Sequence, residues 1–127
     1  MRYIPDEFQQ EFYRHVWSYA RQVPTGKVAT YGQIAKMITL PPGLERQDYK
    51  EFSARWVGDA MAQCPNDVPW QRIINAQGKV SKRVDAQKQK TLLEQEGLVF
   101  IDDKLNMTLY QWDENSTTED LTQASLF

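Results

Sequence analysis

The feature that most constrains this chain is the stretch Val68-Pro69-Trp70-Gln71-Arg72-Ile73-Ile74. Proline fixes its own φ and disfavours helical geometry at the residue before it, so the stretch predicts a rigid turn that presents Trp70. The two β-branched residues at its end predict a short buried strand behind the turn. A tryptophan beside a buried strand is usually a core residue, so its neighbours must decide whether this one is a binding surface.

The residues around Trp70 are strongly basic. Residues 70–90 hold six basic side chains against one acid, a local charge of +5 in a chain whose formal net charge is -2. The basic residues are Arg72, Lys79, Lys82, Arg83, Lys88 and Lys90, and the acid is Asp85. An aromatic ring on a rigid turn inside a basic field is typical of nucleic-acid binding, because the cations contact phosphates and the ring stacks on a base.

Composition excludes several kinds of protein. A chain of 127 residues with 41% hydrophobic and 12% aromatic content predicts one globular domain. One cysteine and one histidine leave no intrachain disulfide and no His/Cys zinc site, and no apolar run is long enough to span a membrane. Cys64 precedes a proline and has no histidine nearby, which predicts a partly buried thiol rather than a nucleophile. We expect a monomer without cofactor or metal in the reducing cytoplasm, associated with the nucleoid if the chain is bacterial.

The charge is unevenly distributed along the chain. Residues 102–127 carry six acids and one base, which leaves a net charge of +3 in residues 1–101. This split predicts a DNA-binding domain over residues 1–112 and an acidic, loosely ordered tail over residues 113–127. The tail either reduces non-specific DNA binding or holds a partner, and the sequence leaves both alternatives open.

Hydrophobic periodicity predicts a mainly helical fold. Apolar residues at helical spacing indicate a helix from residue 6 to about 22, with Asp6 as its cap. Thr30 and Gln33 match a capping box that starts a short helix over residues 31–38. We expect a loop over residues 39–52, in which residues 44–52 could include a helical turn, and then a helix over residues 53–63 that Ser53 caps. Two helices joined in this way fit a helix-turn-helix, although the linker is longer than usual.

The second half of the chain predicts short β-hairpins around one helix. Residues 73–80 are expected to form a hairpin that turns at Gly78, in the position of a wing. A helix over residues 85–95 should end at Gly97. Residues 98–101 and 105–109 predict a second hairpin. The expected fold class is therefore a winged helix-turn-helix DNA-binding domain.

Several motifs resemble the O6-alkylguanine-DNA alkyltransferases. Residues 69–72 (PWQR) resemble the Pro-Cys-His-Arg active-site turn of that family, with Trp70 at the nucleophile position and Gln71 at the histidine position. PWQR is similar to the signature of the alkyltransferase-like proteins, which are the non-catalytic relatives. Residues 26–35 (GKVATYGQIA), 55–61 (RWVGDAM) and 92–97 (LLEQEG) also match, so the resemblance extends from Phe8 to about Gly97.

The resemblance implies a role for individual residues. Tyr31 would rotate the 3′ phosphate of the target nucleotide, and Arg55 would fill the gap that the extruded base leaves. Arg83 and the indole of Trp70 would grip the alkylated base, and Glu96 would be a remnant of the catalytic relay. The implied DNA-binding residues are Thr30, Tyr31, Ser53, Arg55, Trp56 and Arg72. The implied lesion pocket consists of Tyr31, Val68, Pro69, Trp70, Ser81, Lys82 and Arg83.

The expected function follows from the exchanged catalytic residues. Alkyl transfer needs a thiolate and a base, and neither an indole nor an amide supplies them. The resemblance therefore implies non-enzymatic recognition of O6-alkylguanine in double-stranded DNA by nucleotide flipping, which would inhibit alkyltransferase repair and mark lesions for nucleotide excision repair proteins. The alternatives are a winged-helix regulator that reads an intact DNA sequence and an active methyltransferase or glycosylase.

Overall fold

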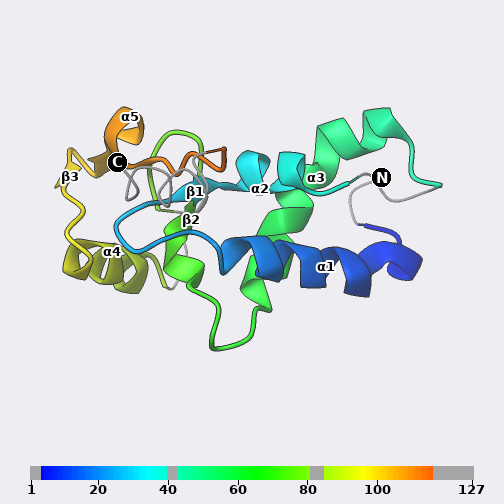
Figure 1. Cartoon of the computed structure of the whole chain (residues 1–127), viewed down its shortest axis with the longest axis horizontal. Coiled ribbons are helices and arrows are strands. Elements are labelled where there is room, and N and C mark those ends of the chain that lie inside the picture. The colour runs from blue at the N-terminus through cyan, green and yellow to red at the C-terminus, as the bar shows by residue number, and fades with distance from the viewer. Residues whose placement is uncertain (1–3, 40–42, 81–84, 116–127) are drawn as a thin grey trace, which may run out of the picture.

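The computed structural model of the chain describes residues 4–39, 43–80 and 85–115 (Figure 1). The elements in chain order are α1 (Asp6–Ala20), β1 (Ala29–Thr30), α2 (Tyr31–Met37), α3 (Arg46–Ala62), the 3₁₀ turn η1 (Trp70–Arg72), β2 (Ile73–Ile74), α4 (Ala86–Gln95), β3 (Phe100–Ile101), β4 (Lys104–Leu105) and α5 (Met107–Tyr110). The helices α1, α2 and α3 lie together, and α4, the β3–β4 hairpin and α5 form the opposite end of the molecule. The predicted mainly helical character is confirmed.

The core sits between α1, α2 and α3. On α1, Phe12, Val16 and Ala20 recur at helical spacing and are buried, as the periodicity predicts. The ring of Phe12 meets Trp56 of α3 edge-on, with ring centroids 6.1 Å apart. The expected cap at Asp6 is wrong, because Pro5 occupies the N-cap position and no side chain bonds to the first amides of the helix.

The capping box at the start of α2 is confirmed. The backbone amide of Gln33 donates to Thr30 Oγ1 at 2.9 Å, and the amide of Thr30 donates to Gln33 Oε1 at 3.3 Å. The helix ends at Met37, one residue before the predicted end, and Ile38 serves as its C-cap. The box fixes where α2 begins, and with it the position of Tyr31 in the first turn.

The helix α3 begins seven residues earlier than predicted, at Arg46 rather than Ser53. The expected loop over residues 39–52 is therefore wrong in its second half. Two aromatic residues explain the difference: Phe52 stacks on Trp56 and the hydroxyl of Tyr49 donates to Ala35 O at 2.6 Å. The first half of α3 has a polar sequence, and these contacts hold it in place. They also pack α3 against α2.

The strands are short and their pairing differs from the prediction. β1 and β2 pair in parallel, with Ala29 opposite Ile73, so residues 73–80 do not form the expected hairpin. The turn at Gly78 is confirmed, because its amide donates to Asn75 O and its φ is +78°. A Cβ at Gly78 would lie 2.6 Å from the carbonyl oxygen of Leu105, so only glycine fits there.

The second predicted hairpin is confirmed in part. β3 and β4 pair in antiparallel fashion, and the positive φ angles of Asp102 and Asp103 form the turn between them. The residues expected to continue the second strand instead form α5, which Asn106 caps by accepting from the amide of Thr108. Within the described part of the chain, no helix is long and apolar enough to cross a membrane.

Candidate nucleic-acid interface

Trp70 lies on a tight turn, as the sequence predicts. Its amide donates to Val68 O at 2.7 Å, and the amide of Arg72 donates to Pro69 O at 3.0 Å, which closes the 3₁₀ turn. β2 follows directly, with both isoleucines buried. The indole is half-buried, because one part of it packs against the core formed by α1, α2 and α3 and the rest remains accessible.

A hollow of about 360 Å³ opens beside this indole, and we call it the Trp70 hollow. Its walls come from the end of α3, the turn that follows, η1 and the first turn of α4. The lining residues are Met61, Ala62, Cys64, Pro65, Asn66, Trp70, Asp85 and Lys88. The site thus combines a flat aromatic surface, a thioether and groups of both charges, a mixture that suits a polar heterocycle such as a nucleobase.

The helix α3 links this hollow to Arg55. Arg55 is exposed, and Ala62, which lines the hollow, follows seven residues later on the same helix. Seven residues are close to two helical turns, so the two share one face about 10 Å apart along the axis. A Cβ added at Gly58, between them, would meet nothing within 4 Å. This face therefore leaves room for a close-fitting partner between the guanidinium and the hollow.

The side chain of Arg72 is engaged within the protein, and its DNA-binding role stays a prediction. Its Nε donates to Glu96 Oε1 at 3.0 Å and to Oε2 at 3.1 Å, while Nη1 donates to the carbonyl oxygen of Val23 at 2.9 Å. Only 17% of the Arg72 side chain and 10% of the Glu96 side chain are exposed. Arg72 instead fixes the turn that carries Trp70 to the loop after α1.

Glu96 collects three donors at the base of the same turn. Its carboxylate accepts from Arg72, from Gln71 Nε2 at 2.8 Å and from the amide of Gly26 at 3.0 Å. Burial alone would raise the pKa of Glu96, but these hydrogen bonds and the charge of Arg72 outweigh it and hold the pKa below its ordinary value. Gln71 is thereby fixed as a donor to a carboxylate, so its side chain has a structural role.

Several residues expected to contact DNA or line the pocket are buried. Trp56 is fully buried in the core, and Ser53 is 6% exposed in the middle of α3, so neither reaches a DNA surface. Thr30 is buried and its hydroxyl caps α2. Val68 is 2% exposed and belongs to the core rather than to the Trp70 hollow. The prediction that α3 starts at residue 53 also left out the aromatic contacts of its first half.

The remaining predicted residues divide into two groups. Tyr31 is half-buried at the start of α2, and Pro69 is half-buried at the start of η1, but neither lines the Trp70 hollow. Ser81, Lys82 and Arg83 lie outside the described residues. The structure adds to the site several residues that the sequence did not assign to the pocket: Met61, Ala62, Asn66, Asp85 and Lys88. The spacing between Arg55 and Ala62 in the sequence could have indicated that Ala62 lies on the same face as Arg55. The positions of Asp85 and Lys88 could not be predicted in this way, because they depend on how α4 packs in the folded structure.

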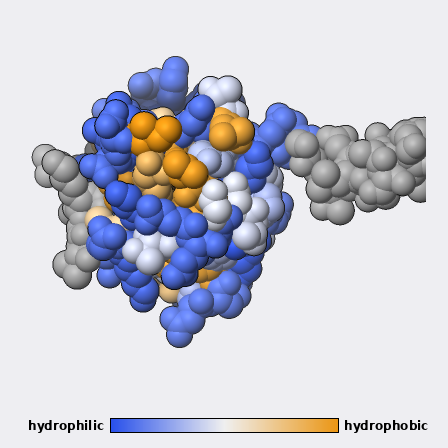
Figure 2. All heavy atoms as spheres, turned by 90° about the vertical axis from the view of Figure 1, so that its left-hand side faces the viewer, coloured by the Kyte–Doolittle hydropathy of each residue, from blue (hydrophilic) through white to orange (hydrophobic). Residues whose placement is uncertain are grey.

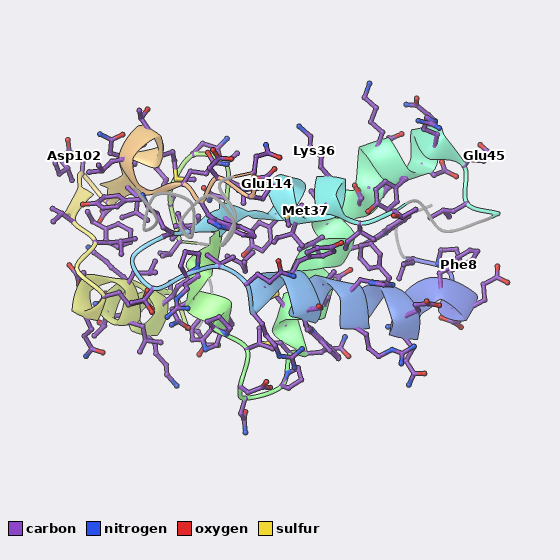
Figure 3. All side chains as sticks on the ribbon, in the orientation of Figure 1. Phe8, Lys36, Met37, Glu45, Asp102 and Glu114 are labelled. Atoms are coloured by element: carbon purple, nitrogen blue, oxygen red, sulfur yellow. The ribbon has the colours of Figure 1, made fainter. Side chains whose placement is uncertain are left out.

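The chain after α5 returns to α2. Val28 forms a bridge with Gln111 and accepts from the amide of Trp112. Gln33 Nε2 then donates both to Trp112 O, at 2.6 Å, and to Glu114. Lys36 and Glu114 border the same open hollow of about 550 Å³, and Figure 3 shows them on one side of the molecule. The first residues of the predicted acidic tail are thus attached to α2, and residues 116–127 lie outside the described part.

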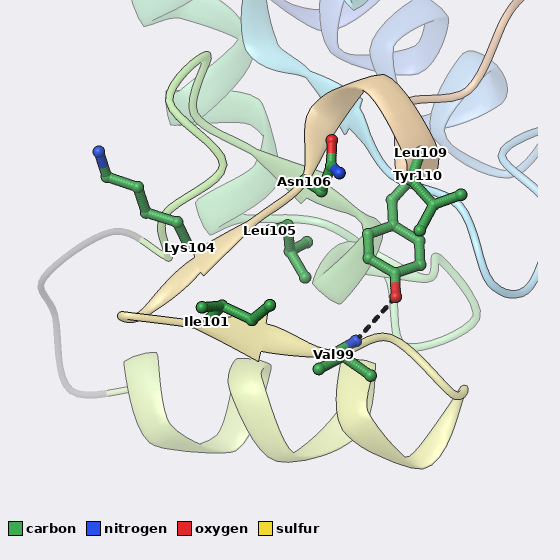
Figure 4. A pocket seen from close by; sticks show the side chains of 7 residues that line it. All are labelled: Val99, Ile101, Lys104, Leu105, Asn106, Leu109 and Tyr110. Atoms are coloured by element: carbon green, nitrogen blue, oxygen red, sulfur yellow. Dashed lines mark hydrogen bonds between the residues drawn. The ribbon is translucent and has the colours of Figure 1, made fainter.

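A third hollow, beside the β3–β4 hairpin, is mainly apolar. It measures about 250 Å³ and lies between β3, β4 and α5 (Figure 4). Val99, Ile101 and Leu109 are 57%, 70% and 56% exposed, and all three line it. The hydroxyl of Tyr110 accepts from the amide of Val99 at 3.2 Å and holds the wall together. We call this the apolar hollow. Figure 2 shows a group of hydrophobic residues surrounded by hydrophilic ones on this face of the molecule.

Known proteins resemble this chain in both sequence and fold. The family described as the DNA-binding domain of 6-O-methylguanine DNA methyltransferase matches residues 11–98. Alkyltransferase-like protein 1 of Schizosaccharomyces pombe is 38% identical over 112 residues, which cover 80% of this chain and 94% of that protein. A DNA base-flipping protein of Vibrio parahaemolyticus is 38% identical over 106 residues, covering 80% of this chain and 96% of the relative.

Solved structures of proteins from this family also resemble the fold of this chain. The crystal structure of S. pombe Atl1 with damaged DNA containing O6-carboxymethylguanine superimposes with a TM-score of 0.68 at 37% identity, covering 82% of this chain and 96% of that one. A variant of Mycobacterium tuberculosis O6-methylguanine methyltransferase reaches 0.52 at 31% identity, covering 73% of this chain and 50% of that one. The likeness to the S. pombe structure confirms the predicted helical, winged helix-turn-helix fold class.

Proposed function

Because this chain belongs to the alkyltransferase-like proteins of the O6-methylguanine DNA methyltransferase family, we propose that it binds O6-alkylguanine in duplex DNA by flipping the damaged nucleotide and does not repair it. The observation that supports this most is the position of Trp70. Its indole stands on a rigid turn that resembles the turn on which the alkyltransferases carry their nucleophile, and a hollow opens beside it. An aromatic wall next to a cavity can hold a base by stacking.

The helix α3 would supply the second part of the mechanism. Arg55 is exposed on α3, and no ion pair or hydrogen bond engages its side chain among the described residues. It is therefore available to enter the groove and fill the space that the extruded base leaves. Tyr31, in the first turn of α2, would rotate the phosphate. Flipping costs a few kcal/mol of stacking and pairing energy, and less at a weakened pair.

Discrimination would come from the lesion itself. An O6-alkyl group removes the N1 proton of guanine and weakens its pairing with cytosine. The damaged nucleotide therefore costs less to extrude than a normal one, and once extruded it offers an enlarged purine to the indole. Both effects favour damaged over intact sites, without any reading of the surrounding sequence.

The two side chains that resemble the family's nucleophile and base positions, Trp70 and Gln71, cannot carry out alkyl transfer. Such a transfer requires a thiolate activated by a neighbouring base. Gln71 stands where the family has its histidine, and its amide donates to Glu96. The single histidine of the chain, His15, is exposed on α1 and faces Glu11 at 3.7 Å. Cys64 lines the hollow, but neither Gln71 nor His15 can serve it there as a base.

A protein that holds a lesion without repairing it would have two consequences. It would shield the alkylated base from alkyltransferases and so inhibit their action. It would also present a stable protein–DNA complex to nucleotide excision repair proteins, which we propose as partners. We further propose that the chain works as a monomer in the cytoplasm, on the nucleoid if it is bacterial.

The test compares two duplexes that differ only at one guanine, which is either normal or O6-methylated. We expect tighter binding to the methylated duplex, measured by fluorescence anisotropy, and no transfer of radiolabel from the methyl group to the protein. Equal affinity for both duplexes would support the alternative, a winged-helix regulator that reads intact sequence. Labelled protein, or strand breaks after alkali, would indicate a methyltransferase or a glycosylase.

A further inference from the structure

The Trp70 hollow carries charge as well as an aromatic wall. Asp85 is the N-cap residue of α4, and Lys88 follows three residues later, so both side chains lie on the same face of the helix. Both line the hollow opposite the residues from α3. Any adduct that enters the hollow therefore meets one carboxylate and one ammonium group in addition to the indole.

The position of Lys88 is not explained by the stability of α4. A cation in the first turn of a helix opposes the helix dipole, which favours negative charge there. Lys88 is exposed, and within the described residues it forms neither an ion pair nor a hydrogen bond, not even with Asp85. Lys90 on the same helix differs, because it pairs with Asp103 at 3.0 Å and lies over the ring of Phe100.

We propose that Lys88 determines which adducts the Trp70 hollow prefers, and that it favours O6-alkyl groups that end in a carboxylate over neutral groups of the same size. This inference rests on the proposed function. The ammonium group of Lys88 would pair with the carboxylate at the end of the adduct while the purine ring stacks on Trp70. Asp85 would work in the opposite direction, by repelling an anionic adduct.

The expected size of the effect is modest. A single ion pair at a partly exposed site changes affinity by no more than roughly fivefold. The neighbouring indole and the thioether of Met61 exclude some water from the hollow, so we expect the upper end of that range. A preference of this size is large enough to measure when the duplexes differ in one functional group only.

The experiment uses four duplexes of identical sequence whose target is guanine, O6-methylguanine, O6-carbamoylmethylguanine or O6-carboxymethylguanine. The amide and the carboxylate have nearly the same shape and differ in charge. For the unmodified chain we expect the carboxymethyl duplex to bind roughly fivefold tighter than the carbamoylmethyl duplex. Lys88→Gln should bring this ratio close to one, Lys88→Arg should retain it, and Asp85→Asn should raise it.

Lys90→Gln is the matched control, because it removes a cation from the same helix outside the hollow. It should leave the carboxylate-to-amide ratio unchanged. A lysine that merely contacts DNA phosphates would weaken binding to all four duplexes by the same factor and leave the ratio intact, so an unchanged ratio in Lys88→Gln would overturn this inference alone. Equal binding of the unmodified chain to guanine and O6-methylguanine would instead overturn the proposed function.

Discussion

The Trp70 hollow and the apolar hollow differ in chemistry. The Trp70 hollow is bounded by a half-buried indole, Asn66 and two charged residues, and it adjoins the helix that carries Arg55. The apolar hollow is bounded by the exposed side chains of Val99, Ile101 and Leu109, and Lys104 is the charged residue among the described residues that line it. The first matches a polar, planar ligand, and the second matches an apolar surface.

The two regions also differ in how they are held. Behind the Trp70 hollow, Arg72 and Glu96 are largely buried and fix the turn through several hydrogen bonds. The apolar hollow is built on a hairpin of two two-residue strands and on a four-residue helix, joined by the hydrogen bond between Val99 and Tyr110. A site that must hold an extruded base in one geometry benefits from a rigid support, and we therefore propose the Trp70 hollow, rather than the apolar hollow, for DNA recognition.

The largest expected effect comes from removing the support of the Trp70 hollow. Arg72→Met would leave the Glu96 carboxylate without its charged partner, and we expect a loss of about 3 kcal/mol in the free energy of unfolding. Urea denaturation measures it. Arg21→Met is the matched control, since Arg21 pairs with Asp67 at the exposed surface, and its effect should be far smaller. Equal effects of the two variants would show that the buried network is unimportant.

The second effect concerns DNA contacts. Arg55→Ala and Tyr31→Ala should each weaken binding to an O6-methylguanine duplex roughly tenfold or more, because each removes a group that acts on the flipped state. Circular dichroism should show an unchanged fold. Lys50→Ala removes another exposed cation from α3, and it should weaken damaged and intact duplexes equally and only slightly. Full retention of lesion affinity in the first two variants would refute their assigned roles.

The third effect is a pH dependence of stability. The folded state lowers the pKa of Glu96 from its ordinary value of 4.5, so its ionised form contributes stability above that pH and loses it as the pH falls through the lowered pKa. We expect Glu96→Gln to flatten the fall in unfolding free energy below about pH 4.5. Asp103→Asn, which removes an exposed partner of Lys90, should retain most of the acid dependence.

The smallest effect is expected at the apolar hollow. Ile101→Ser and Leu109→Ser change exposed side chains distant in sequence from α2 and α3, and they should alter affinity for the lesion duplex by less than about twofold. Anisotropy titrations of both variants measure this. A large loss of affinity would mean that DNA binding extends to this end, and the contrast between the two hollows would no longer hold.

Local signals in the sequence predicted much of the helical framework. The capping box of Thr30 and Gln33 fixed the start of α2, and the turn at Val68-Pro69 correctly presented Trp70. Both are local, since each depends on residues no more than three positions apart. Features that depend on distant contacts were missed, above all the early start of α3, which Tyr49 and Phe52 stabilise by packing on α2 and on Trp56.

The candidate site shows the same division. The sequence identified Trp70 and Arg55, which are exposed or half-exposed near the hollow. It assigned Arg72 to DNA, although its guanidinium is taken up by Glu96 and Val23 from distant parts of the chain. Lys88 was visible only as one of many basic residues, because its place in the hollow depends on how α4 packs beside η1. Tertiary packing decides which members of a basic cluster face a ligand.

The most direct test of the central claim is the fluorescence of a cytosine analogue placed opposite O6-methylguanine. If the protein turns the damaged nucleotide out and holds it without reacting, the fluorescence should rise on binding, fall again when unlabelled duplex competes for the protein, and leave the protein mass unchanged. Binding without a rise in fluorescence, or a protein that gains the alkyl group, would contradict the account.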